Sequence, residues 1–350
     1  MPPRAAGAVE GDALYGATPV IGVSVIGLGN ALQPHARSLV DLAERVRVVW
    51  AAASSVARLK DVGDRYGFPT TTDVTRAIED PAVDAVLVLT PANAHLPIAE
   101  AAFAAGKHVL CEKPLEVSIA RGEQLIAAGR RADRRLGICL QHRFRPGSQR
   151  LRQVLQSGML GEVQAATLMV PWWRPQSYYD EPGRGVLARD GGGVLITQAI
   201  HSLDLFRWLL GIERVEAAQV RTTALHRMES EDYAAALLRL GNSAVGTMVG
   251  TVAAYPGSPE WLHIIGSRGT ARMDGGNLRL ALLDGSEEVF TDTAGTGSGA
   301  SVMAFSHDAH RAVLSDFLDA IEQGRDPAVP GEEALATQRV IDAILEKGRG

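Results

Sequence analysis

The sequence predicts an α/β protein with two domains, a doubly wound parallel sheet followed by an α/β domain with a large, mostly antiparallel sheet. From Val20 onward, short β-rich runs alternate with longer helical stretches. A glycine turn, Gly27-Leu28-Gly29, directly follows the first of these runs. After about Gln141 the pattern changes to consecutive strands joined by short polar turns. A chain of 350 residues is long enough for each domain to bury its own core.

The predicted first domain covers residues 19–142 and follows a predicted flexible tail at residues 1–18. Its predicted strands are residues 20–26, 46–52, 85–89, 108–111 and 136–140. Its predicted helices extend from the glycine turn to about Glu44, over 54–66 and 94–105, and near 119–132. Continuous Val, Ile and Leu runs between helices are typical of buried parallel strands, so this half predicts a doubly wound sheet.

The predicted second domain covers residues 143–350. Its predicted strands are residues 163–170, 214–222, 234–240, 243–251, 262–265, 271–273 and 278–282. Its predicted helices begin at Leu151, extend from the three glycines at 191–193 to about Leu210, and cover 308–323 and 332–346. A loop at 293–301 is rich in Gly, Ser and Thr. Consecutive strands with short turns predict a mostly antiparallel sheet.

Composition excludes several classes of protein. The chain is 46% hydrophobic and 21% charged with a formal net charge of −5, so no basic excess indicates nucleic acid or a membrane surface. Its longest apolar stretches have the length of strands, so no transmembrane helix is predicted. Cys111 and Cys139 both lie in apolar runs, which favours reduced, buried thiols and a cytoplasmic protein. No residues have metal-ligand spacing, and His307 and His310 are interpreted as structural, so no metal is predicted.

The glycine turn lies between a strand and a helix, which is the context of a dinucleotide-binding turn. Glycines there let the backbone approach a pyrophosphate at the N-terminus of the helix. Leu32 stands where the usual pattern has its third glycine. The predicted cofactor contacts in this turn are Gly27, Gly29, Asn30, Ala31 and Leu32.

The end of the second strand bears on the choice between NAD and NADP. An acidic residue there binds the adenosine ribose in NAD-preferring enzymes, but this chain has Ala51-Ala52-Ala53-Ser54-Ser55. No carboxylate repels a 2′-phosphate, and Ser54, Ser55 and Arg58 offer donors to it. We therefore expect NADP or NAD, with NADP favoured; the alternative is that Arg58 is simply a solvated helix residue.

Two further residues complete a set that indicates hydride transfer. Lys113 follows the strand at 108–111 within Glu112-Lys113-Pro114, and His201 lies on the helix after the three glycines. Thr197 is four residues before His201, so on one continuous helix the two would share a face. A cofactor turn, a strand-end lysine and a histidine supply a dinucleotide cradle and two proton-handling groups.

These segments resemble the Gfo/Idh/MocA oxidoreductase family. The resemblance lies in residues 84–91 with His95, in residues 106–115, and in residues 191–204. It implies a Rossmann domain and an open-faced α/β domain whose sheet forms a subunit interface, hence a homodimer or homotetramer. It also implies that Lys113 and His201 flank the reacting carbon, with a Lys-Pro bond that is frequently cis. Further expected cofactor contacts are Thr90, Pro91, Asn93, His95, Glu112 and Lys113.

Lys113, His201 and Thr197 are the predicted catalytic residues. Burial beside a cationic ring lowers a lysine pKa and makes the amine a usable base. Many family members have an aspartate where this chain has Thr197, and a threonine supplies no negative charge to His201. Lys113 is therefore the preferred base, with His201 orienting the substrate or relaying the proton.

The segment 172–189 is the predicted specificity element, because its aromatic residues can line a cleft and its arginines can bind an anion. The alternative is packing against a neighbouring subunit. Predicted substrate contacts are Arg143, Trp173, Arg174, Tyr178, Arg184, Gln198 and His201. The expected substrate is a sugar, a cyclitol or a related cyclic hydroxy compound, acidic or derived from an aromatic ring. Two other functions stay open at this point: a cofactor-binding regulatory protein and an assembly protein without cofactor.

Overall fold

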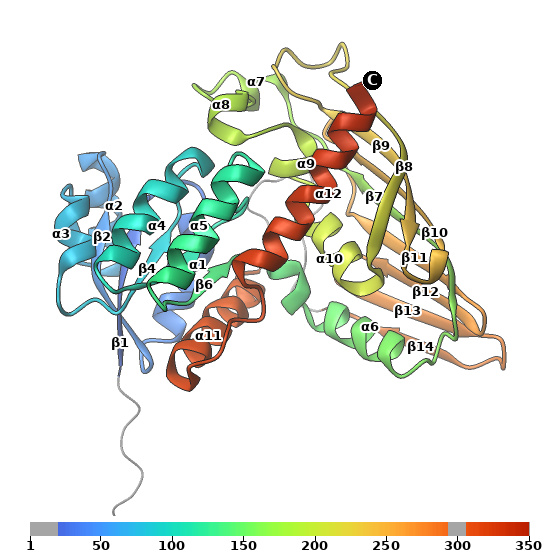
Figure 1. Cartoon of the computed structure of the whole chain (residues 1–350), viewed down its shortest axis with the longest axis horizontal. Helices are drawn as coiled ribbons and strands as arrows, with labels where there is room; N and C mark the ends of the chain where they lie inside the picture. Colours follow the sequence, from blue (N-terminus) through green and yellow to red (C-terminus); the bar gives the residue numbers. More distant parts are fainter. Residues whose placement is uncertain (1–19, 293–305, 350) are drawn as a thin grey trace, which may run out of the picture.

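The computed structural model describes residues 20–292 and 306–349, and Figure 1 shows two lobes, each built on one sheet. The predicted tail at 1–18 and the predicted loop at 293–301 lie outside the described residues. The predicted α/β fold with a parallel and a mostly antiparallel sheet is confirmed.

The first sheet has six parallel strands in the order β3-β2-β1-β4-β5-β6. Every residue of β1 and β4 is buried, because helices cover both faces of the sheet. The strands are β1 (Ile21–Ile26), β2 (Val46–Ala52), β3 (Thr70–Thr71), β4 (Ala85–Val88), β5 (His108–Cys111) and β6 (Leu136–Ile138). The helices are α1 (Leu32–Asp41), α2 (Val56–Tyr66), α3 (Val74–Glu79), α4 (His95–Ala104) and α5 (Ile119–Arg131), with the short turn η1 (Ala92–Ala94).

Strand order places the binding crevice. Because β1 has β2 on one side and β4 on the other, the chain reverses its direction of winding there. In open α/β sheets, ligands bind beyond the carboxyl ends of the strands at this reversal. The segments that follow β1, β4 and β5 all open at that edge. The short elements β3 and α3 were not predicted from the sequence, since two-residue strands and six-residue helices carry little periodic signal.

The second sheet has eight strands in the order β14-β13-β12-β11-β7-β10-β9-β8. The pair β7–β10 is parallel and the other pairs are antiparallel. The strands are β7 (Val163–Pro171), β8 (Ile212–Arg221), β9 (Tyr233–Leu240), β10 (Val245–Thr251), β11 (Trp261–Gly266), β12 (Gly269–Asp274), β13 (Asn277–Leu282) and β14 (Glu287–Phe290). Strand β14 was not predicted; it adds one more edge strand.

One face of this sheet is covered by helices and the other is open (Figure 1). The covering helices are α6 (Pro146–Gln156), α10 (Ile200–Leu210) and α12 (Gly331–Arg349). Alternate residues of the strands are therefore buried, and large apolar side chains on the open face are exposed, namely Leu237, Val245, Ile265 and Val289.

Helix α11 (Asp308–Gln323) returns to the first lobe although it comes late in the sequence. Its residues Val313, Leu314, Phe317 and Leu318 belong to the same hydrophobic core as β1 and α1. Helix α11 therefore packs in the core of the first lobe, next to β1 and α1.

The helix predicted after the three glycines is wrong in one respect that matters for the site. The structure has two helices, α9 (Val194–Thr197) and α10, which are separated by Gln198 and Ala199. The Glu231 carboxylate accepts hydrogen bonds from the backbone N–H groups of Gly193 and Leu195, and the Thr197 hydroxyl donates back to the Gly193 carbonyl. A threonine hydroxyl that bonds back to the carbonyl four residues earlier often bends a helix, and α9 ends at this residue. The four-residue spacing therefore does not place Thr197 and His201 on one helix face.

Candidate active site

The glycine turn after β1 lies against the loop that follows β4. Gly27 has a φ of +99°, and a Cβ there would lie 2.8 Å from the backbone nitrogen of Thr90. Only glycine fits this close approach without strain. The contact fixes Thr90 and Pro91 beside the first turn of α1, as the predicted cofactor site requires.

Gly29 is placed differently, because it opens onto free space. A Cβ at Gly29 would meet only the Arg58 guanidinium, at 4.0 Å. Asn30 is exposed and Ala31 is half-buried, whereas Leu32 is buried in the core. Leu32 therefore supports the turn from within rather than facing a ligand. The bare backbone at Gly29, at the N-terminus of α1, fits the pyrophosphate of a dinucleotide.

The predicted ribose-side residues lie at the start of α2. The Ser55 hydroxyl caps this helix by accepting a hydrogen bond from the Arg58 N–H, and Ser54 is exposed. The Arg58 guanidinium is exposed beside Gly29. No carboxylate stands at the end of β2, as the sequence indicates.

His95, predicted as a cofactor contact, has a supporting position instead. Its ring is fully buried, with Nε2 3.0 Å from the Thr90 carbonyl and Nδ1 3.3 Å from the Leu115 carbonyl. The ring therefore lies in the interior and connects the loop after β4 with the loop after β5. Pro91 and Asn93, by contrast, are exposed at the edge of the sheet where a cofactor would lie.

Glu112 and Lys113 lie at the end of β5, and the Lys113-Pro114 bond is cis. One Glu112 oxygen accepts a hydrogen bond from the Lys113 backbone N–H at 3.0 Å, and the other lies 2.7 Å from His35 Nε2. The Lys113 Nζ donates to the backbone carbonyl of Thr197 at 2.7 Å. The Thr197 hydroxyl points back to Gly193, so it is the main chain of Thr197 that meets the lysine.

Burial of the Lys113 amine favours its neutral form, which can accept a proton. The pKa of Lys113 is lowered by removal from water, and the nearby Glu112 carboxylate opposes that shift. The pKa of His201 is held well below its usual value by burial and by the neighbouring Lys113. A neutral imidazole with so low a pKa is a poor proton acceptor, which favours Lys113 as the base.

His142 follows the last strand of the first sheet, a position at which it could border the cleft, although it is not among the predicted catalytic or binding residues. Its ring lies against that of His201, with centroids 5.1 Å apart and planes tilted by 32°. Arg145 donates a hydrogen bond to His142 Nε2 at 2.6 Å and pairs with Glu260 at 2.7 Å. Because an arginine only donates, His142 Nε2 is the acceptor and the proton lies on Nδ1. The signal available in the sequence was the position of His142, immediately after the last strand of the first sheet.

Arg143 does not face the cleft, so its prediction as a substrate contact is not supported. Its guanidinium is 3% exposed and binds both oxygens of Asp204 at 2.7 Å. It also approaches Glu333 at 3.0 Å. The pair joins the end of the first lobe to α10 and α12.

We expect Arg143→Met to lower the free energy of unfolding by about 3 kcal/mol, since it leaves the buried Asp204 carboxylate with Arg207 at 3.9 Å and the Thr337 hydroxyl as its remaining partners. Denaturant titration measures the loss. Arg150→Met is the matched control: its pair with Glu288 is a third exposed on both sides, so its cost should stay below about 1 kcal/mol. A stable Arg143→Met protein with a raised KM would instead return Arg143 to the substrate site.

The predicted specificity segment forms an aromatic and arginine-bearing cluster. The Arg174 guanidinium lies 5.4 Å from the Trp172 ring and 5.8 Å from the Tyr178 ring, and burial lowers its pKa. Arg184 stacks on Tyr178 at 4.3 Å and donates to its hydroxyl at 2.7 Å. Trp173 packs edge-on against Tyr255, and Gln198 is buried beside Thr197. The positive charge of Arg174 contributes to the lowered pKa of Lys113, so the guanidinium lies within electrostatic range of the lysine.

The site combines a bare glycine turn at the reversal of a doubly wound sheet with a half-buried lysine and a buried histidine. This combination is typical of an oxidoreductase that uses a nicotinamide dinucleotide. Residues 21–139 match the family of oxidoreductases with an NAD-binding Rossmann fold, and residues 148–272 match the GFO/IDH/MocA C-terminal domain. The chain belongs to the Gfo/Idh/MocA family.

Individual relatives agree with this assignment. The myo-inositol 2-dehydrogenase of Thermotoga maritima is 29% identical over 89% of this chain and 91% of its own. A 1-carboxy-3-chloro-3,4-dihydroxycyclohexa-1,5-diene dehydrogenase of Comamonas testosteroni is 26% identical over 93% and 94%. The WlbA dehydrogenase of Bordetella pertussis, solved with NADH and UDP-GlcNAcA, is 26% identical with a TM-score of 0.83, covering 94% of this chain and 96% of that one. The prediction of an oxidoreductase with a nicotinamide cofactor is confirmed.

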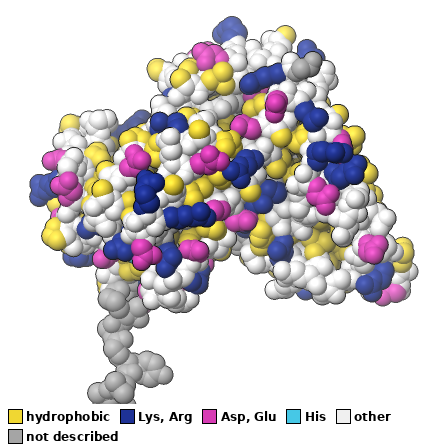
Figure 2. Space-filling view, in the orientation of Figure 1, with side chains coloured by type: hydrophobic (Ala, Val, Ile, Leu, Met, Phe, Trp, Pro, Cys, Tyr) yellow, Lys and Arg dark blue, Asp and Glu magenta, His cyan; other side chains and the backbone are white. Residues whose placement is uncertain are grey.

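Two expected features of the surface can be compared with the structure. None of the helices within 20–292 and 306–349 combines the length and apolar character needed to cross a bilayer. On the face drawn in Figure 2, acidic and basic side chains are interspersed.

Proposed function

We propose that this protein transfers a hydride between a nicotinamide cofactor and a hydroxyl-bearing carbon of a sugar, cyclitol or related cyclic compound, with Lys113 as the base. The observation that carries the proposal is the half-buried Lys113 side chain, whose amine is held by the Thr197 carbonyl at the edge where the glycine turn opens. The bound nicotinamide supplies the hydride acceptor for the alcohol. Thr90, Pro91 and Asn93, together with the turn at Gly27 and Gly29, are the residues that would hold the cofactor.

Proton transfer is the task of the protein's own residues. The neutral Lys113 amine takes the hydroxyl proton at Nζ as the alcohol becomes a carbonyl, and returns it in the reverse direction. Its hydrogen bond to the Thr197 carbonyl fixes the direction of the amine. His201, kept neutral by burial, binds and orients the substrate hydroxyl through a ring nitrogen. Thr197 acts through its backbone carbonyl.

An acidic substrate fits the cluster that borders Lys113. Arg174 supplies positive charge, whereas the charge of Arg184 is paired with Glu181, and Trp173 and Tyr178 supply flat surfaces for a ring. The two relatives named for, or solved with, a carboxylated compound support the same substrate class. We propose that Arg174 binds the carboxylate while the ring hydroxyl meets Lys113.

The test is turnover on a panel of matched pairs: neutral sugars and cyclitols beside their carboxylated counterparts, each with NADP and NAD. Turnover on one class of ring hydroxyls supports the proposed function, and a preference for acids that Arg174→Ala removes supports the substrate class. Cofactor binding without turnover on any cyclic hydroxy compound would contradict the enzymatic proposal and favour the regulatory alternative.

The proposed cofactor preference is for NADP. It rests on the absence of an acid at the end of β2 and on the Arg58 guanidinium beside the pyrophosphate turn. We expect Arg58→Ala to weaken NADPH binding about 10-fold or more, the scale of one lost hydrogen bond to a charged group, and to leave NADH nearly unchanged. Fluorescence titration measures both. Equal effects on the two cofactors would assign Arg58 to the pyrophosphate alone.

We also propose a cytoplasmic homodimer or homotetramer. Leu237, Val245, Ile265 and Val289 lie on the open face of the second sheet, and their burial between subunits would remove apolar area from water. Light scattering coupled to size exclusion gives the assembly. Leu237→Lys with Ile265→Lys should then produce a smaller species.

A further inference from the structure

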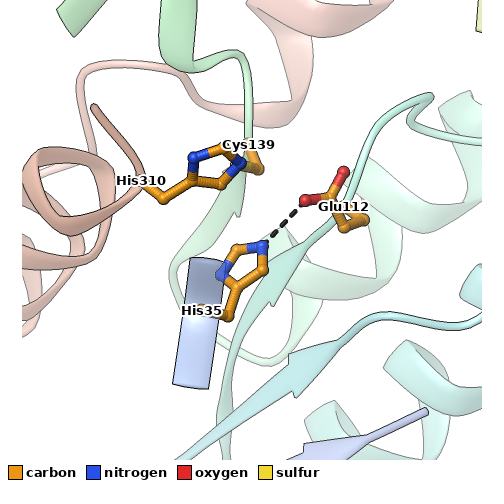
Figure 3. A group of neighbouring side chains, drawn as sticks. All are labelled: His35, Glu112, Cys139 and His310. Atoms are coloured by element: carbon orange, nitrogen blue, oxygen red, sulfur yellow. Dashed lines mark hydrogen bonds and ion pairs between the residues drawn. The ribbon is translucent and has the colours of Figure 1, made fainter. Parts of the chain in front are cut away.

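Four buried side chains from four separate segments converge next to one another, one of them the Glu112 that precedes Lys113 (Figure 3). His35 comes from α1, Glu112 from the end of β5, Cys139 from the residue after β6, and His310 from α11. One possible ligand atom from each lies within 4.8 Å of all the others. The exposed fractions are 1, 9, 0 and 4%. We propose that this cluster binds one zinc ion.

The donor set is the chemical argument. Two imidazoles, a thiol and a carboxylate are ligands that zinc takes in tetrahedral protein sites. Hard cations such as magnesium prefer oxygen alone and would not use the thiol or the imidazoles. Cys111, the other cysteine, is equally buried but is not part of the group.

The geometry needs only side-chain adjustment. Tetrahedral bonds of about 2.0–2.3 Å put ligand atoms roughly 3.3–3.8 Å apart. The atoms farthest apart must therefore approach by roughly 1 Å. His35 Nε2 and Glu112 Oε1, now 2.7 Å apart, must separate to admit the ion. The edge-to-face arrangement of the His35 and His310 rings, with centroids 5.2 Å apart, lets each imidazole turn without meeting the other face-on.

Charge balance also favours a divalent ion. A zinc ion with one carboxylate and one thiolate has no net charge, so the interior gains no uncompensated ion. The remaining Glu112 oxygen keeps its hydrogen bond from the Lys113 N–H. The ion would lie on the protein side of Glu112, behind the loop that carries the lysine.

Four protein ligands close the coordination shell, which is the pattern of structural rather than catalytic zinc. The ion would join α1, the ends of β5 and β6, and α11, segments from opposite ends of the chain. These same segments carry the glycine turn and Lys113. Zinc would thus stabilise the segments that form the cofactor site without contacting the substrate. This proposal does not depend on the proposed function.

The test uses the tag-free, full-length protein, freed of metal by a chelator and then given zinc or cobalt. We expect about one zinc per chain after dialysis, by elemental analysis. Cobalt in the same place should give a thiolate-to-metal charge-transfer band and the visible bands of a tetrahedral ion. Cys139→Ser should abolish the thiolate band, whereas Cys111→Ser, the matched control, should retain it.

A second readout covers the case in which a variant folds poorly. Zinc should raise the thermal unfolding midpoint of the wild type and of Cys111→Ser, because a ligand that binds only the folded state stabilises it. It should not raise that of Cys139→Ser or His310→Gln. Absence of retained zinc in the wild type, or a thiolate band that survives in Cys139→Ser, would overturn the proposal and leave the cluster as a hydrogen-bonded support for Lys113.

Discussion

Replacing Lys113 by alanine should lower turnover by at least ~100-fold, the usual scale for a general acid–base group, while cofactor affinity stays nearly unchanged. The amine is the group whose pKa is lowered by burial and whose direction is fixed by the Thr197 carbonyl. The alanine removes that group but leaves the Glu112 bond to the backbone N–H of residue 113 in place. Steady-state kinetics on the active panel compound, with a parallel NADPH titration, measures the two effects.

Lys347→Ala is the control for Lys113→Ala, because Lys347 is exposed near the end of α12. It should have wild-type turnover. If Lys113→Ala kept turnover within a few-fold of wild type, the base would have to be another group, and His201 would be the next to test. A loss of cofactor affinity equal to the loss of turnover would mean that Lys113 serves binding and not proton transfer.

Replacing Gly29 by valine should weaken cofactor binding by roughly 100-fold or more, as expected when about 3 kcal/mol of charged hydrogen bonding is lost. Gly29 does not have a positive φ, and the space before it is open apart from the Arg58 guanidinium. The valine therefore fits the fold and fills the place of the pyrophosphate. Fluorescence titration gives the affinity, and the thermal unfolding midpoint should change little.

Gly27→Ala provides the contrast. Its Cβ would lie 2.8 Å from the backbone of Leu89 and Thr90, at a φ of +99°. We expect a stability loss of about 1–3 kcal/mol from backbone strain, with further loss from the clash. We therefore expect Gly27 to be needed for the stability of the fold and Gly29 for the binding of the cofactor. Normal NADPH binding by Gly29→Val would place the phosphate cradle elsewhere.

The sequence by itself determined the fold class and the main chemical groups. Apolar runs separated by helical stretches specify buried parallel strands, because burial on both faces removes the alternation that an exposed face imposes. The glycine turn, the strand-end Lys113 and the absence of an acid after β2 are local features, so each could be recognised in a short stretch of chain. They remain where the sequence placed them, at the carboxyl edge of the first sheet.

The tertiary structure decided which polar residues face the ligand and which support the site. Arg143 and His95 have the residue types of binding groups, but long-range partners at Asp204 and at two loop carbonyls bury them. The first amides of α9 are capped by Glu231, a residue more than 30 positions later in the chain. The group of His35, Glu112, Cys139 and His310 has no spacing signal, since its members lie up to 275 positions apart and meet only when α11 packs on α1. Contacts between distant segments depend on packing, and no local pattern encodes them.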